Sequence, residues 1–188
     1  MFLNIAAFNL FIQAMHSYGT KVAAAVTIAF NWDVVAFIPM LGMGYAVTAL
    51  VGQNIGAGDY IEARRSAFMG LKTAWIYSFT MVIIFLSASR GMVDLFASGF
   101  EGDSREITAL AIVMLRLVSI YIMADSAQIV FVGALRGAGD TVWVMRVSVV
   151  YHWVFALTAV LLIKFVRVDP VLVWICFIAF LFSLGITM

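Results

Sequence analysis

An acidic residue lies inside one of the most apolar stretches of the sequence. Asp125 stands between the pairs MA and SA and is followed by the run IVFVGA. Tyr121 and Gln128 lie four positions before it and three positions after it, so a helix places both one turn away on the same face. A carboxylate with two hydrogen-bonding neighbours suits a proton or a sodium ion; the alternative is a structural aspartate bound to a neighbouring helix. Because an ionisable side chain inside a membrane costs about 2.5 kcal/mol or more, Asp125 is the first candidate for a functional site.

Two polar residues precede a proline in another apolar stretch. Asn31 and Asp33 lie about two turns before Pro39, whose ring removes one backbone hydrogen bond and predicts a kinked helix. A polar pair beside a kink in a cavity-lining helix suits a cation or a cationic drug; a hydrated helix end is the equal alternative. Gln13 is a further cavity candidate, although a hydrogen bond between helices is the commoner role of such a residue.

The composition indicates which elements must hold these residues. Hydrophobic residues make up 65% of the 188 positions and charged residues 11%, and the mean hydropathy is +1.09; soluble domains are about 45–50% apolar and about 25% charged. The chain is therefore expected to be an integral membrane protein. Stretches long enough to cross a bilayer predict an all-α, polytopic bundle of about six spans, at residues 1–18, 23–51, 67–89, 107–133, 142–164 and 170–188. The first is short and the last runs to the final residue, which suggests a piece of a longer chain.

The same composition narrows the function. A formal net charge of +1 argues against nucleic acid as a partner. His16 and His152 stand alone and the carboxylates are scattered, so neither a metal site nor the clustered acids and bases of an enzyme is expected. The expected partners are membrane lipid and a small cationic or amphiphilic molecule, with no cofactor beyond a coupling Na⁺ or H⁺.

A pattern of glycines followed by an aspartate occurs twice. GQNIGAGD occupies residues 52–59 and GALRGAGD occupies residues 133–140, each after a long apolar run. A phosphate-binding loop needs lysine and then serine or threonine after its last glycine, and an aspartate follows here instead. Because glycines close helices and aspartates cap them, each pattern predicts a turn between two helices. Two spans separate the turns, which places both on the same side of the membrane. The predicted turn residues are Gly52, Gly56, Gly58 and Asp59, and Gly133, Gly137, Gly139 and Asp140.

Two of these runs resemble a known transporter family. FNWDVVAFIPMLGMGYAVTALVGQNIGAGD, followed by EARRSA, is similar to the eighth helix and following loop of the multidrug and toxic compound extrusion (MATE) transporters. ADSAQIVFVGALRGAGDT is similar to the tenth helix and its loop. The resemblance covers essentially residues 1–188 and only one lobe of a twelve-helix transporter, the C-terminal one, from part of its seventh helix into its twelfth. On this resemblance, no part of the N-terminal lobe is expected within residues 1–188.

The resemblance carries implications for function. It implies part of a Na⁺- or H⁺-coupled antiporter that exports drugs by alternating access, located in the bacterial inner membrane with both turns in the cytoplasm. It assigns the coupling-cation aspartate to Asp125 and places Asn4, in FLNIAAFNLF, where many bacterial members have a glutamate. An amide can coordinate Na⁺ but cannot titrate. The chain then needs the missing lobe or a second copy. A flippase of lipid or lipid-linked sugar with related architecture, or a non-transporting scaffold, is the alternative.

Overall fold

The chain folds into helices that match the predicted spans one for one. A computed structural model describes residues 2–97 and 104–187. Five of its helices, α2 to α6, are long and apolar enough to cross a membrane, and α1 is shorter, at 15 residues. The prediction of a helical membrane bundle is confirmed. The elements are α1 (Phe2–His16), α2 (Thr20–Gly56), α3 (Tyr60–Ala97), α4 (Ser104–Gly137), α5 (Thr141–Leu161), a short π-helix η1 (Leu162–Val166) and α6 (Pro170–Thr187).

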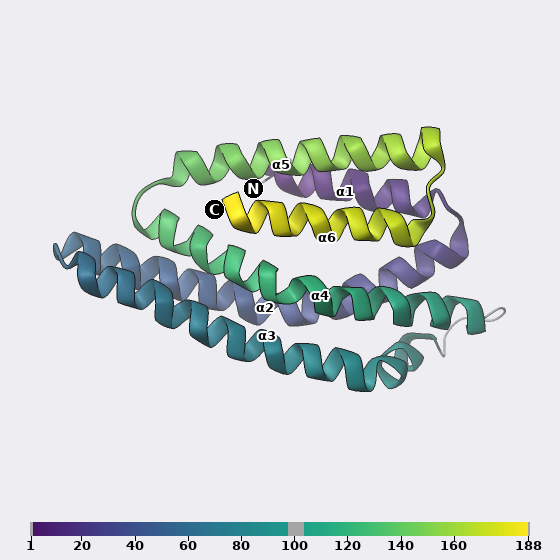
Figure 1. Cartoon of the computed structure of the whole chain (residues 1–188), viewed down its shortest axis with the longest axis horizontal. Coiled ribbons are helices and arrows are strands. Elements are labelled where there is room, and N and C mark those ends of the chain that lie inside the picture. The colour runs from purple at the N-terminus through teal and green to yellow at the C-terminus, as the bar shows by residue number, and fades with distance from the viewer. Residues whose placement is uncertain (1, 98–103, 188) are drawn as a thin grey trace.

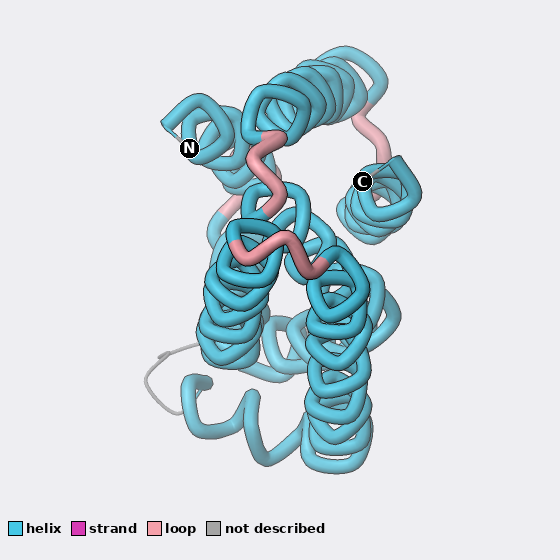
Figure 2. Tube along the Cα trace, turned by 90° about the vertical axis from the view of Figure 1, so that its left-hand side faces the viewer, coloured by secondary structure: helices cyan, strands magenta, loops and turns pink. Residues whose placement is uncertain are grey.

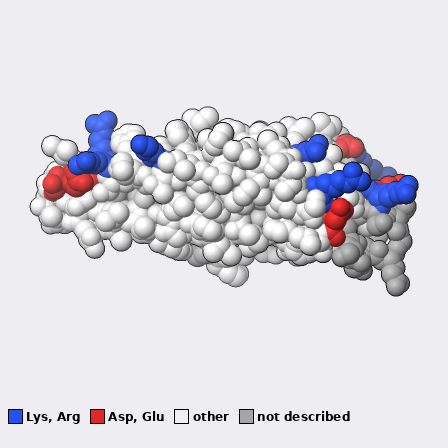
Figure 3. All heavy atoms as spheres, turned by 90° about the horizontal axis from the view of Figure 1, so that it is seen from below, with Lys and Arg blue, Asp and Glu red and all other residues white. Residues whose placement is uncertain are grey.

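Three of the helices are longer than the spans predicted for them. Helices α2, α3 and α4 have 37, 38 and 34 residues, which at 1.5 Å per residue gives about 50–57 Å. The hydrocarbon core of a bilayer is only about 30 Å thick. Figure 3 shows the Lys, Arg, Asp and Glu side chains of one face gathered at the two ends of the molecule, with an uncharged belt between them. The protein is therefore an integral, multi-pass membrane protein whose helices extend beyond the lipid.

The helices form two groups. Figures 1 and 2 show α1, α5 and α6 on one side and α2, α3 and α4 on the other. Buried aromatic side chains of α1, α2, α5 and α6 fill much of the main core, together with aliphatic side chains of α4. A smaller core lies among α2, α3 and α4, and includes Val47, Leu71 and Val130. The bundle is thus held together by apolar contacts along both groups.

Helices α2 and α4 touch through glycines. A Cβ atom on Gly133 would lie 2.5 Å from the carbonyl oxygen of Gly44, and one on Gly137 would lie 2.6 Å from that of Thr48. Real Cβ atoms do not approach a backbone this closely, so only glycine fits at these two positions of α4. Small residues at such contacts let membrane helices pack backbone to backbone.

These contacts correct part of the sequence prediction. Gly52 and Gly133 lie inside α2 and α4, and Gly56 and Gly137 are the last residues of those helices. None of the four forms a turn. The physical reason is that the contact between the helices, rather than the chain reversal, requires Gly133 and Gly137 to lack side chains.

The last glycine and the aspartate of each pattern do form the predicted turns. Gly58 and Gly139 have φ angles of +78° and +93°, which glycine adopts without strain. In both turns the amide of the aspartate donates to the carbonyl five residues earlier, at 2.9 Å, and the amide of the glycine to the carbonyl three residues earlier, at 3.0 Å. Asp59 and Asp140 then each accept from the amide three residues on, at 2.9 and 3.2 Å. Both turns lie at the same end of the bundle (Figures 1 and 2), as predicted.

Helix α2 continues through its proline. Figure 1 shows α2 as a bent helix, and Pro39 lies inside it with its ring exposed. Helix α3 forms hydrogen bonds to α2 before and after Pro39. Tyr77 donates one to the carbonyl of Ala36 (3.1 Å), and Ser78 donates one to the sulfur of Met40 (3.6 Å). A bend at a proline is expected where the backbone ladder loses a bond.

The connections at the opposite end are also tied together. The Tyr18 hydroxyl, between α1 and α2, donates a hydrogen bond to the carbonyl of Val168, between η1 and α6. Burial, and then the nearby charge of Asp169, raise the pKa of Tyr18 above its ordinary value, so the hydroxyl keeps its proton and stays a donor. Lys21 at the start of α2 pairs with Glu106 at the start of α4.

Candidate functional site

Asp125 is buried on α4 together with the tyrosine one turn before it. Asp125 is only 9% exposed, and Tyr121 is 1% exposed. Asp125 forms no ion pair with a lysine or arginine within the described residues. A carboxylate in this position is shielded from water and is not neutralised by a basic neighbour.

Asp33 on α2 belongs to the same group. Its charge acts on both Tyr121 and Asp125, and the Tyr121 hydroxyl is close enough to Asp33 to interact with it. Asp33 is half-buried and lies more than three turns inside α2, which begins at Thr20. Asp33 is therefore not at the end of α2, and its role as a site residue stays a prediction.

The register of α2 against α4 explains why these residues meet. Gly44 contacts Gly133, and Thr48 contacts Gly137, so each pair is separated by the same 89 positions. The two helices run in the same direction, because both end at the turn end of the bundle (Figure 1). The same separation places Asp33 level with Ile122, between Tyr121 and Asp125. The contacts of Gly133 and Gly137 with α2 thus belong to the register that brings Asp33 to the level of Tyr121.

The Tyr121 hydroxyl is the third polar member of this group. It is buried and forms no hydrogen bond of ordinary geometry within the described residues, and the charges of Asp33 and Asp125 both act on it. A phenol can donate to either carboxylate and can accept through its oxygen. The three side chains together present oxygen atoms, which hard cations prefer as ligands, and the two carboxylates can also take up a proton.

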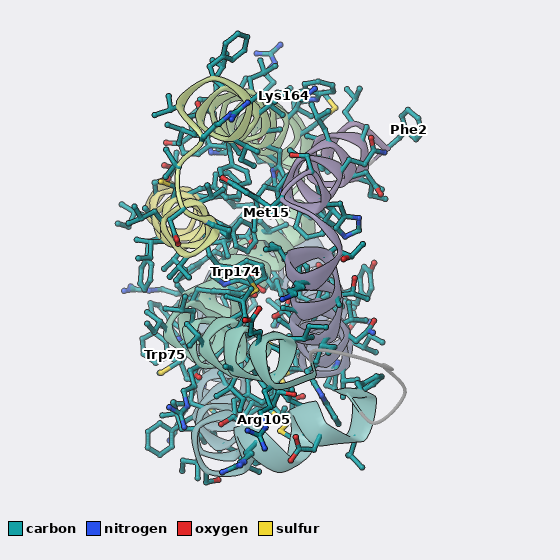
Figure 4. All side chains as sticks on the ribbon, turned by 90° about the vertical axis from the view of Figure 1, so that its right-hand side faces the viewer. Phe2, Met15, Trp75, Arg105, Lys164 and Trp174 are labelled. Atoms are coloured by element: carbon teal, nitrogen blue, oxygen red, sulfur yellow. The ribbon has the colours of Figure 1, made fainter. Side chains whose placement is uncertain are left out.

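Aromatic rings border the group. Tyr121 packs edge-on against Phe177 of α6, with 5.5 Å between ring centroids, and Phe30 of α2 packs against Trp174 at 4.9 Å. Trp174 is fully buried and lies in the middle of the bundle when it is viewed from the end away from the turns (Figure 4). These rings exclude water, and a charge interaction is stronger where water is excluded.

The other predicted site residues lie elsewhere. Gln128 is half-buried beside Gly185 of α6 and forms no hydrogen bond with Asp125 among the residues that the structure describes. Asn31 and Gln13 are exposed. Asn4, on α1, is half-buried, and its side-chain oxygen is buried without a hydrogen-bond partner in the described part of the chain. No hydrogen bond in that part joins Asn4 to Asp125, so the carboxylate group is built from α2 and α4.

Sequence reasoning found Asp125 and Tyr121 together but not their connection to Asp33. Tyr121 and Asp125 are four residues apart on one helix, so spacing alone connects them. Asp33 lies on another helix, and its place depends on the contacts of Gly133 and Gly137 with α2. The sequence signal for this register is the pair Gly133 and Gly137, which the turn prediction treats as part of the chain reversal.

Comparisons with known proteins agree with this fold. The MatE family model matches residues 1–161. A probable multidrug resistance protein NorM of Pseudomonas aeruginosa is 28% identical over 158 residues, which cover 84% of this chain and 32% of that protein. A protein of the same description from Pasteurella multocida is 31% identical, over 82% of this chain and 32% of its own length. The chain thus spans about a third of the length of these curated relatives.

A solved structure gives the same result for the fold. A crystal structure described as MATE in complex with MaL6 superposes with a TM-score of 0.87, covering 98% of this chain and 41% of that one at 16% sequence identity. At 16% sequence identity, the similarity between the two structures supports a shared arrangement of helices alone.

Proposed function

Because this chain belongs to the MatE family, we propose that it forms one lobe of a cation-coupled antiporter that exports cationic or amphiphilic drugs. The group formed by buried Asp125 and Tyr121 with half-buried Asp33 is the observation that supports this proposal most directly. The relatives are described as probable multidrug resistance proteins, which supports drug export. We place the protein in a bacterial inner membrane with the two turns in the cytoplasm.

Coupling follows from the charges of the group. Two ionised carboxylates in a water-poor interior repel each other and are poorly solvated. A Na⁺ or a proton bound between α2 and α4 removes this cost and favours the arrangement in which the two helices stay close. Release of the cation on the other side of the membrane favours a different arrangement. A ligand can shift a conformational equilibrium only by such a difference in affinity.

Alternating access requires a second lobe. In transporters of this kind the substrate site lies between two halves that move against each other. We propose that this lobe works with an N-terminal lobe or with a second copy of itself. The drug then shares the space between the lobes with the route by which the coupling cation reaches Asp125.

Replacement of Asp125 tests the proposal. In cells that express the transporter containing this chain, ethidium efflux driven by a Na⁺ or proton gradient is expected to fall roughly tenfold or more in Asp125→Asn, since a tenfold loss corresponds to only about 1.4 kcal/mol of cation binding. Asp33→Asn is expected to weaken efflux as well. Asp94→Asn, which changes an exposed acid of α3, is the matched control and should transport normally.

The variants are informative because asparagine has the size of aspartate and removes only a buried charge. The Asp125→Asn protein should therefore keep its thermal stability in detergent. Gradient-driven efflux that is unchanged by Asp125→Asn contradicts the proposal. Binding of a lipid-linked sugar by the purified protein, without binding of a cationic dye, favours a flippase instead.

A further inference from the structure

One face of α3 carries a groove. The groove has a volume of about 550 Å³ and follows α3 from Phe68 to Thr80, with Met123 of α4 also contributing to it. Its α3 residues recur every three or four positions, so they form a single face of the helix. Most of them are apolar and several are large. Trp75, on this face, lies toward the outside of the bundle in the end-on view (Figure 4) and is 44% exposed.

Two cations stand at the end of this groove nearest the turns. Lys72 is exposed and lines the groove. The guanidinium of Arg64 lies over the ring of Phe68, another lining residue, 5.5 Å from its centroid. Neither cation forms an ion pair within residues 2–97 and 104–187, whereas Arg65 beside them pairs with Glu62 at 3.4 Å. The groove therefore joins an apolar wall to a local excess of positive charge.

The depth of Lys72 along α3 matches the membrane surface. Residues 73–89 contain no charged side chain and span about 25 Å of helix, close to the roughly 30 Å of the hydrocarbon core. Lys72 is thus at the boundary of the hydrocarbon, where lipid phosphates lie. Trp75, one turn deeper, is at the level where tryptophans are enriched in membrane proteins.

We propose that this groove binds an anionic phospholipid of the leaflet on the side of the turns. The headgroup phosphate lies between Lys72 and Arg64, and one acyl chain follows Trp75, Phe79 and Met123. The α3 face from Phe68 to Thr80 is about 18 Å long, enough for the roughly 15 Å of one leaflet. The two cations would repel a cationic drug, so the charge of the groove is opposite to that of the carboxylate group. The proposal therefore does not depend on the proposed transport function.

Lipid retention during native mass spectrometry tests the groove directly. The purified protein is released from micelles containing equal amounts of palmitoyl-oleoyl phosphatidylglycerol and phosphatidylcholine, which differ in headgroup charge and not in acyl chains. Wild type is expected to retain phosphatidylglycerol preferentially. Lys72→Gln and Arg64→Gln should each reduce that preference about fivefold, the fold-change that corresponds to the contribution of one basic side chain near an anionic lipid surface.

The chain provides its own control. Arg65→Gln removes the same charge next to Arg64, but from an arginine already paired with Glu62, and should leave retention unchanged. Ile76→Trp, which fills the groove without changing its charge, should reduce retention of both lipids; circular dichroism verifies that each variant is folded. Free glycerol phosphate in excess should not displace the lipid, since it has no acyl chain.

Several outcomes overturn the proposal. Equal retention of the two lipids by wild type shows that the groove does not select anionic headgroups. An equal loss in Lys72→Gln and Arg65→Gln shows that only net charge matters. Displacement of phosphatidylglycerol by ethidium identifies a drug site, and displacement by glycerol phosphate identifies a plain anion site. All of these measurements are independent of ethidium efflux.

Discussion

The two glycine–aspartate patterns are each eight residues long and agree at five positions, but their surroundings differ. Their last glycines and aspartates adopt matching conformations with matching hydrogen bonds. The earlier glycines differ: Gly133 and Gly137 touch the backbone of α2, whereas Gly56 has open space around its Cα and Gly52 meets only an ordinary contact, 3.4 Å from the oxygen of Gly137. One pattern therefore encodes a turn, and the other encodes a turn and a helix contact.

This difference separates local from tertiary information. The turn needs only residues adjacent in sequence, so it recurs wherever the pattern recurs. The helix contact needs a partner surface, and Gly133 and Gly137 of α4 have one in the carbonyls of Gly44 and Thr48. Equivalent substitutions in the two patterns should thus differ at the earlier glycines and agree at the turns.

The largest difference is expected at the glycines inside the helices. Gly137→Ala should destabilise the protein by roughly 1–3 kcal/mol, because the new methyl group meets the backbone of Thr48, which cannot move aside. Gly56→Ala should be neutral or slightly stabilising. Thermal unfolding in detergent, followed by circular dichroism, measures both. Equal melting temperatures for the two variants contradict the proposed role of the α2–α4 contact.

A smaller and equal effect is expected at the turn glycines. Gly58→Ala and Gly139→Ala each force an alanine to a positive φ angle, which costs about 1–2 kcal/mol. The same melting experiment should give two decreases of similar size. A much larger decrease for Gly139→Ala shows that the second turn also has a tertiary role.

The smallest effect is expected at the capping aspartates. Asp59→Ala and Asp140→Ala each remove one acceptor from a helix N-terminus, which costs about 1 kcal/mol. Asparagine, which keeps an acceptor oxygen, should restore most of the stability. If asparagine does not restore it at one of the turns, the aspartate charge there has a function besides capping.

The amino-acid sequence predicts the number and order of the helices better than their ends. Hydropathy located residues 23–51, but α2 runs from Thr20 to Gly56, because a helix continues into water for as long as packing and caps support it. The same limit applies to α3, which begins at Tyr60 although its apolar stretch begins at residue 67. Contact with lipid determines which part of a helix is apolar, whereas the turns determine where the helix begins and ends.

The candidate site was predictable only within one helix. Tyr121 and Asp125 follow from helical spacing, whereas Asp33 required the register of α2 on α4. Gln128 is on the expected helix, but it lies beside Gly185 of α6, because the faces of α4 are divided among α2, α3 and α6. Spacing along a sequence cannot show which neighbour a given face meets.

The close approach of α2 and α4 also limits how the two helices can move. With the backbone of Gly133 against that of Gly44, neither helix can slide along the other at this end, and the remaining freedom is rotation about the point of contact. Asp33 lies about 16 Å along α2 from this pivot, on the arm that points away from the turns. A tilt of a few degrees is therefore enough to separate the acidic residues by more than an ångström.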